Sequence, residues 1–169
     1  MSPFGAVLIL MGSLGCAWNM SREEKQRLQT LRELSAAVSA LGAELSLHLT
    51  DLPQLTGLMA ERAPGDAGRF FTLLAGRMEM LGERSFSSLW QEVARETLKH
   101  LDGDSLAVFL NLGDTLGRYE VGEQLAALEG CRTALDRAAE ELSAALPDRR
   151  RISFGLWSAA GALLAILLI

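Results

Sequence analysis

The sequence has few of the residues from which catalytic and metal sites are built. It holds two histidines, His48 and His100, and two cysteines, Cys16 and Cys131. Each histidine stands without the nearby ligands at helical spacing that a metal site needs. The cysteines are too few to form a disulfide framework, and no phosphate-binding Gly-x-x-x-x-Gly-Lys-Ser/Thr loop occurs. We therefore expect a chain that is not an enzyme and takes no cofactor, metal or small-molecule substrate.

Charge is absent from both ends of the chain. Residues 2–20 and 152–169 carry no charged side chain, so all 16 Lys and Arg and all 21 Asp and Glu lie between them. Eighteen helical residues reach about 27 Å, close to the thickness of a bilayer's hydrocarbon core. The alternatives are buried core helices or a cleaved signal peptide. A signal peptide has a basic residue before its apolar run, and none precedes Arg22. We expect transmembrane helices over 2–20 and 152–169, flanking one domain over 22–148.

Basic residues lie where each apolar segment meets the middle domain. They are Arg22, Lys25, Arg27, Arg149, Arg150 and Arg151. Because cytoplasmic flanks of membrane helices are enriched in Lys and Arg, the domain is predicted to be cytoplasmic, with these side chains at anionic lipid headgroups. The net charge of −5 argues against a nucleic-acid partner. Small residues four apart, such as Gly12/Cys16 and Gly155/Ala159, would let the spans pack closely against other membrane helices. The alternative is that small residues are simply common in membrane spans.

The middle domain is predicted to be helical throughout. No segment alternates apolar and polar residues, as a half-buried strand does. Leu31, Leu34, Val38 and Leu41 form one stripe of a first helix that continues from the apolar segment. Shorter helices are expected over 52–63 with Asp51 as cap, over 67–81 after a turn at 64–68, from Ser85, and from a cap at Asp104.

The last soluble helix is expected over 120–146, where Pro147 marks a joint. Its apolar positions follow a heptad rhythm at Leu128, Cys131, Leu135, Ala138, Leu142 and Ala145. The first and last helices should pair antiparallel. The predicted fold is therefore an all-α bundle of about six helices between two membrane spans.

An otherwise apolar helix contains two glycines, Gly113 and Gly117. They need an explanation, because each glycine lowers the stability of a helix by about 1 kcal/mol relative to alanine. Close helix packing is one interpretation, and a docking surface is the other.

Several segments resemble the stage III sporulation protein AB family of endospore-forming bacteria, over the whole length. They are Gly5-Ala6-Val7, the Leu31–Leu34 run leading to Ala43-Glu44-Leu45, Leu89-Trp90, and the Gly-x-x-Leu-Gly pattern of Gly113, Leu116 and Gly117 with Gln124 after it. The chain departs from the family at Asp51-Leu52-Pro53, where Thr-Pro-Leu is more usual, and at Leu112, where Phe is. Glu120 only loosely matches an acidic residue of the family.

The resemblance implies a role in the complex that joins mother cell and forespore, in the mother-cell membrane around the forespore. It implies a helical domain similar to the cytoplasmic domains of type II secretion F-like platform proteins. The implied partners are a secretion-type ATPase and other membrane or ring subunits, and self-association is left open. The docking residues suggested by the family pattern are Glu44, Gly113, Leu116, Gly117 and Gln124.

A two-span signalling protein, or a general membrane scaffold with a cytoplasmic coiled coil, is the alternative. A sensor would need a sizeable outer domain, and none is predicted. A transporter subunit is disfavoured because neither predicted span holds an ionisable residue.

Overall fold

The structure is a computed structural model that describes the backbone of residues 3–48, 51–116, 118 and 120–168. Side chains are described for residues 22–47, 51–116, 118 and 120–145. Within these residues the chain forms six α-helices and one short 3-10 helix, with no strand. The predicted all-α class is confirmed.

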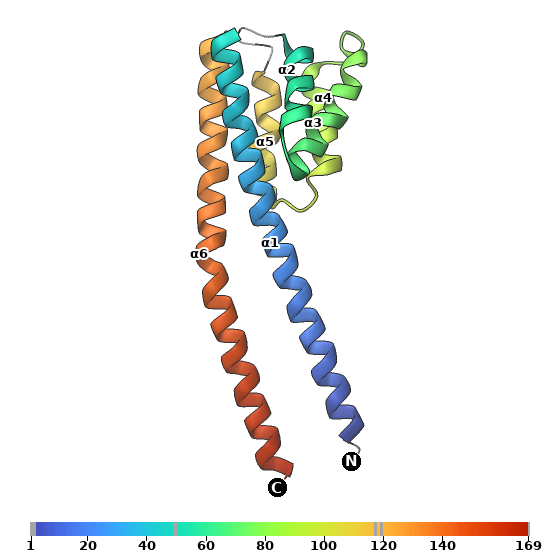
Figure 1. The fold of residues 1–169 in the computed structure, drawn as a ribbon, viewed down its shortest axis with the longest axis vertical. Coiled ribbons are helices and arrows are strands. Elements are labelled where there is room, and N and C mark those ends of the chain that lie inside the picture. The colour runs from blue at the N-terminus through green and yellow to red at the C-terminus, as the bar shows by residue number, and fades with distance from the viewer. Residues whose placement is uncertain (1–2, 49–50, 117, 119, 169) are drawn as a thin grey trace.

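Two long helices form one side of the molecule. Helix α1 spans Pro3–His48 and helix α6 spans Val121–Leu168. They pack against each other and run in opposite directions, so both chain termini lie at the same end (Figure 1). The expected continuity between the first apolar segment and the amphipathic helix is confirmed. The joint expected at Pro147 is wrong, because α6 continues helically through that position.

Four shorter helices cover one side of this pair (Figure 1). They are α2 (Leu52–Arg62), α3 (Gly65–Arg77), α4 (Phe86–Thr97) and α5 (Gly103–Thr115), with the 3-10 helix η1 (Met78–Met80) after α3. Helix α4 begins as predicted, since the Ser85 hydroxyl accepts a hydrogen bond from the Ser88 N–H at 3.2 Å. Asp51 is the N-cap of α2, although its side chain makes no capping hydrogen bond.

Three predicted boundaries are wrong. Helix α3 begins at Gly65, inside the segment expected to be a turn, because a side chain from α1 accepts a hydrogen bond from the Asp66 amide in its first turn, as described below. It ends at Arg77 and tightens into η1, so it does not reach Leu81. Helix α5 is capped at Asp102, which leaves Asp104 in its first turn. Each error is a shift of a few residues in an element that exists.

The core fills the space between the long pair and the short helices. The apolar stripe of α1 is buried as predicted, from Leu31 to Leu45. On α6 the heptad positions Leu128, Cys131 and Leu135 are buried, whereas Ala138, Leu142 and Ala145 are half-buried. A single hydrophobic cluster therefore joins all six helices.

Among the residues whose side chains are described, no helix is long and apolar enough to cross a membrane. The predicted spans, 2–20 and 152–169, have their side chains outside the described residues. The prediction that they span a bilayer stays a prediction.

Candidate docking surfaces of the helical domain

Trp90 of α4 lies at the centre of the core, fully buried. Its ring centroid is 4.7 Å from that of Phe70 and 4.9 Å from that of Phe109, and the Phe70 contact has the edge-to-face geometry that aromatic pairs prefer. The indole Nε1–H donates a 2.8 Å hydrogen bond to the backbone carbonyl of Phe109. Trp90 thus ties α4 to α3 and α5, and its one polar atom is satisfied.

Gly113 of α5 lies directly against Trp90. A Cβ atom at position 113 would be 2.9 Å from the Trp90 Cβ and closer still to two ring carbons. Leu116 is also buried, three residues on. Gly117 lies outside the described residues. Of the two interpretations of this glycine segment, close packing is therefore what the structure shows for Gly113.

The other two docking candidates also contact the domain itself. The Glu44 carboxylate forms an ion pair with the Arg62 guanidinium at 2.7 Å, which joins the end of α1 to the end of α2. The Gln124 side chain is 8 % exposed, at the start of α6. The five candidates are not gathered on one surface: Glu44 keeps partial exposure, whereas Gly113, Leu116 and Gln124 are inside.

The predicted basic residues of the membrane interface differ in their surroundings. Arg22 and Lys25 are exposed on α1. Arg27 instead turns to the bundle, where its guanidinium lies 2.9 Å from the carboxylate of Asp102, at the start of α5. The side chains of 149–151 lie outside the described residues. Contact with lipid headgroups stays a prediction for the whole set.

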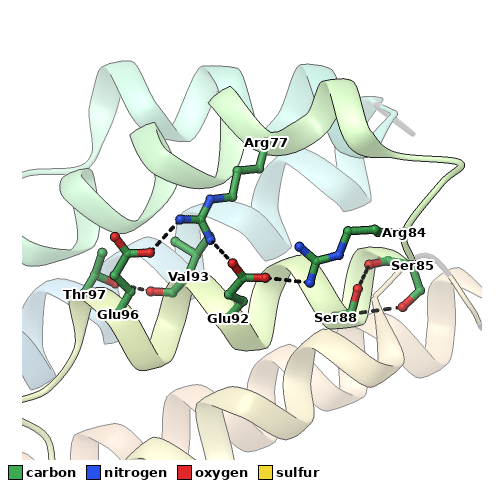
Figure 2. A network of polar contacts seen from close by, with 8 residues as sticks. All are labelled: Arg77, Arg84, Ser85, Ser88, Glu92, Val93, Glu96 and Thr97. Carbon is green, nitrogen blue, oxygen red and sulfur yellow. Dashed lines mark hydrogen bonds and ion pairs between the residues drawn. The ribbon is translucent and has the colours of Figure 1, made fainter.

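A surface network that the sequence did not indicate links α3 to α4 (Figure 2). Arg77, at the end of α3, contacts Glu92 at 2.9 Å and Glu96 at 2.6 Å, and Arg84 contacts the other oxygen of Glu92 at 2.5 Å. The hydrogen bond from Arg84 holds the pKa of Glu92 below its ordinary value, and the charges of both arginines add to this effect. The network joins the end of α3 and the loop after it to α4.

Glu33 of α1 holds the N-terminus of α3. Its carboxylate accepts a 2.9 Å hydrogen bond from the Asp66 N–H and a 2.8 Å bond from the Gln29 amide. The neighbouring Thr30 hydroxyl donates to the Asp66 carboxylate at 2.7 Å. Gly65 has φ +59°, and a Cβ there would collide with the Glu33 carboxylate. These contacts explain why α3 begins earlier than its sequence suggests.

Replacing Glu33 with alanine should therefore lower the free energy of unfolding by about 1 kcal/mol, the usual effect of losing a helix N-terminal acceptor. Glu33→Gln, which keeps an acceptor oxygen, should lose less. Urea unfolding followed by circular dichroism measures both. Glu79→Ala removes an exposed carboxylate of η1 and should change little. An equal loss in the Glu33 and Glu79 variants would contradict the capping role.

Cys131 is a core residue of α6, 4 % exposed. Burial raises the pKa of its thiol to about 12, which leaves almost no thiolate near neutral pH. Among the described side chains, no group of three His, Cys, Asp or Glu could hold a metal ion.

In a Cys16→Ser background, maleimide at pH 8 should label Cys131 about a thousandfold more slowly in the folded chain than in urea. The pKa of Cys131 in the folded chain is raised above the unfolded value of about 9. The contribution of this thiol to the free energy of unfolding is therefore complete below pH 9 and falls as the pH rises towards 12. Rapid labelling of the folded chain would contradict the burial.

Three of the exposed large apolar side chains lie in two separate segments at the end of the domain away from both termini, and a fourth, Leu73, lies on α3. Leu47, at the end of α1, is 73 % exposed. Met80 and Leu81, in the segment between α3 and α4, are 46 % and 40 % exposed. Both segments lie at the end opposite the termini (Figure 1). We call these three residues the distal apolar group; the sequence reasoning missed it, because single leucines and methionines near helix ends carry no pattern.

A family profile described as "Stage III sporulation protein AB" matches residues 3–169. A solved structure titled "Stage III sporulation protein AB" is similar to this one, with a TM-score of 0.65 at 20 % sequence identity. The match covers 72 % of this chain and 97 % of that chain, and at this identity it shows a shared fold. No curated protein matches. Since the family profile covers nearly the whole sequence, the chain belongs to the stage III sporulation protein AB family.

Proposed function

We propose that the chain is a non-enzymatic platform subunit of the sporulation complex that links mother cell and forespore. Its two uncharged terminal segments anchor it in the membrane, and its helical domain is presented to the cytoplasm. The observation that carries this proposal is the geometry of the long helices. Helices α1 and α6 extend beyond the short helices towards the same end, and that end is formed by the two uncharged segments (Figure 1).

The proposed role of the domain is to dock a secretion-type ATPase at the end far from the membrane. The support is the distal apolar group, whose three exposed side chains would be covered by a partner that binds this end of the domain. Leu47 follows Glu44 by three residues, so the docking candidate with partial exposure lies beside this group. Gly113, Leu116 and Gln124 are buried, so they would not contact the ATPase directly.

A photo-crosslinking amino acid placed at Leu47 or Met80 during spore formation tests this role. The expected product joins the chain to the ATPase. The matched control is His100, an exposed residue in the loop between α4 and α5 at the other end of the bundle (Figure 1), which should give no such product. If Leu47 and Met80 crosslink no ATPase, or if only His100 does, the proposed docking end is wrong.

A further inference from the structure

One face of the long helix pair is left uncovered by the short helices. Helices α2 to α5 all lie to one side of α1 and α6 (Figure 1). The exposed residues of the opposite side, between Ala36 and Ser46 on α1 and between Gly122 and Thr133 on α6, form what we call the outer face. Its small members are Ala36, Ser39, Ala40, Ala43, Ser46, Gly122, Ala126, Gly130 and Thr133. On α1 none of the exposed residues in this stretch is charged, whereas about a quarter to a third of an ordinary solvated surface is.

A groove runs along the outer face between the two helices. Its volume is about 300 Å³, and its walls include Ser39, Gly42, Leu125 and Leu128. The charged residues beside it are paired within α6, since Arg132 contacts both Glu129 at 2.5 Å and Asp136 at 3.0 Å. One positive and two negative side chains leave this ion-paired group with a net negative charge. The groove and its flanks thus present short side chains, which let another helix approach closely.

Two charges outside this ion-paired group, Arg32 and Glu140, lie at nearly the same height on the two helices. Ser35 of α1 donates a 2.5 Å hydrogen bond to Asp136 of α6, which fixes the register of the pair. Arg32 precedes Ser35 by three residues, and Glu140 follows Asp136 by four, so in an antiparallel pair their heights agree to within about 1.5 Å. Both side chains are exposed, and among the described residues neither forms an ion pair within the chain.

Arg32 and Glu140 also lie on the same side of the pair as the groove. Arg32 is two helical turns from Ser39, and Glu140 is three turns from Glu129, and both Ser39 and Glu129 line the groove. The outer face therefore carries a positive charge on one helix and a negative charge on the other, at one height. This arrangement is self-complementary under a two-fold rotation about an axis parallel to the helices.

We propose that the outer face binds a second copy of this chain, in a two-fold pair in which Arg32 of each copy meets Glu140 of the other. Helix α1 of one copy then lies against α6 of the other, and every neighbour in the resulting four-helix bundle is antiparallel, as in common bundle folds. The rotation axis leaves all four chain ends on one side. The proposal does not rest on ATPase docking, because it concerns contacts between two copies of this chain; the outer face ends at Ser46, next to Leu47 of the distal apolar group.

Charge reversal tests the pairing on the full chain in detergent. Arg32→Glu gives a chain with glutamate at both position 32 and position 140, and Glu140→Arg gives one with arginine at both. Each should pair poorly with itself and well with the other. When the two variants are mixed with different tags, mixed pairs should exceed random assortment by about tenfold at low salt, the effect of two exposed ion pairs replacing two repulsions. The excess should shrink at high salt.

Glycine filling provides a second test that is independent of charge. Gly130 on the outer face and Gly76 on α3 are both exposed, and a Cβ at either would meet nothing within 4 Å in one chain. Gly130→Leu should weaken self-association at least about tenfold by blocking close approach, whereas Gly76→Leu should leave it unchanged. Both variants should keep the helical circular dichroism.

Arg95→Glu on α4, at another exposed arginine, is the control for charge reversal and should pair like the unaltered chain. A monomeric full chain at micromolar concentration would overturn the proposal. So would pairs that assort randomly in the mixing experiment, or that persist equally in Gly130→Leu, because they would be formed by some other part of the chain.

Discussion

Replacing Trp90 with alanine is expected to lower the free energy of unfolding by about 3–5 kcal/mol, the range for removing a large aromatic side chain from a packed core. Trp90 is fully buried and contacts aromatic rings of α3, α4 and α5, including Phe70, Phe86 and Phe109. Its removal leaves a cavity where these helices meet. Urea unfolding of the full chain, followed by circular dichroism at 222 nm, measures the change.

Trp90→Phe separates packing from hydrogen bonding at the same site. The phenylalanine ring keeps most of the aromatic contacts but leaves the Phe109 carbonyl without the indole donor that now lies 2.8 Å away. We expect a smaller loss, of about 1–3 kcal/mol. If Trp90→Ala cost less than about 1 kcal/mol, this residue could not be at the centre of the core.

Gly113→Ala is expected to destabilise the domain by about 1–3 kcal/mol, although alanine is the better helix former. The new methyl group would lie 2.9 Å from the Trp90 Cβ and nearer to the ring. Trp90 is itself fully buried among other rings, so it has no space into which to move. Helices α4 and α5 would have to separate.

Gly76→Ala is the matched control for Gly113→Ala. Gly76 is also in a helix, but a Cβ there meets nothing within 4 Å. Its substitution should stabilise the chain, by up to about 1 kcal/mol. The two glycine-to-alanine changes should therefore have opposite signs in the same unfolding assay. If both stabilised the chain, Gly113 would not be a packing residue.

The stripe of α1 could be predicted from the sequence because it depends on spacing alone. Leu31, Leu34 and Leu41 recur at helical intervals, and all three are buried. The heptad seam of α6 was predicted in the same way, and Cys131 was placed in the core for that reason. Local patterns of this kind need no knowledge of the partner helix.

The start of α3 and the network around Glu92 could not be predicted, because they depend on residues far apart in the chain. Glu33 reaches Asp66 from another helix, and Arg77 reaches Glu92 and Glu96 across a loop. Whether the docking candidates are exposed could not be predicted from the sequence either. A Gly-x-x-Leu-Gly pattern does not say which side of its helix is exposed, and Gly113 and Leu116 are both buried.

Membrane anchoring with the domain on the cytoplasmic side is the central claim, and thiol labelling at an exposed position tests it most directly. Cys131 is unsuited because it is buried with a raised pKa, so the cysteine is introduced as Gly76→Cys, at an exposed residue with open space around it. In a Cys16→Ser background, expressed in cells that form no forespore so that the chain lies in the cell membrane, a membrane-impermeant maleimide should leave position 76 unlabelled in intact cells and label it after permeabilisation. Labelling in intact cells would place the domain outside and contradict the account.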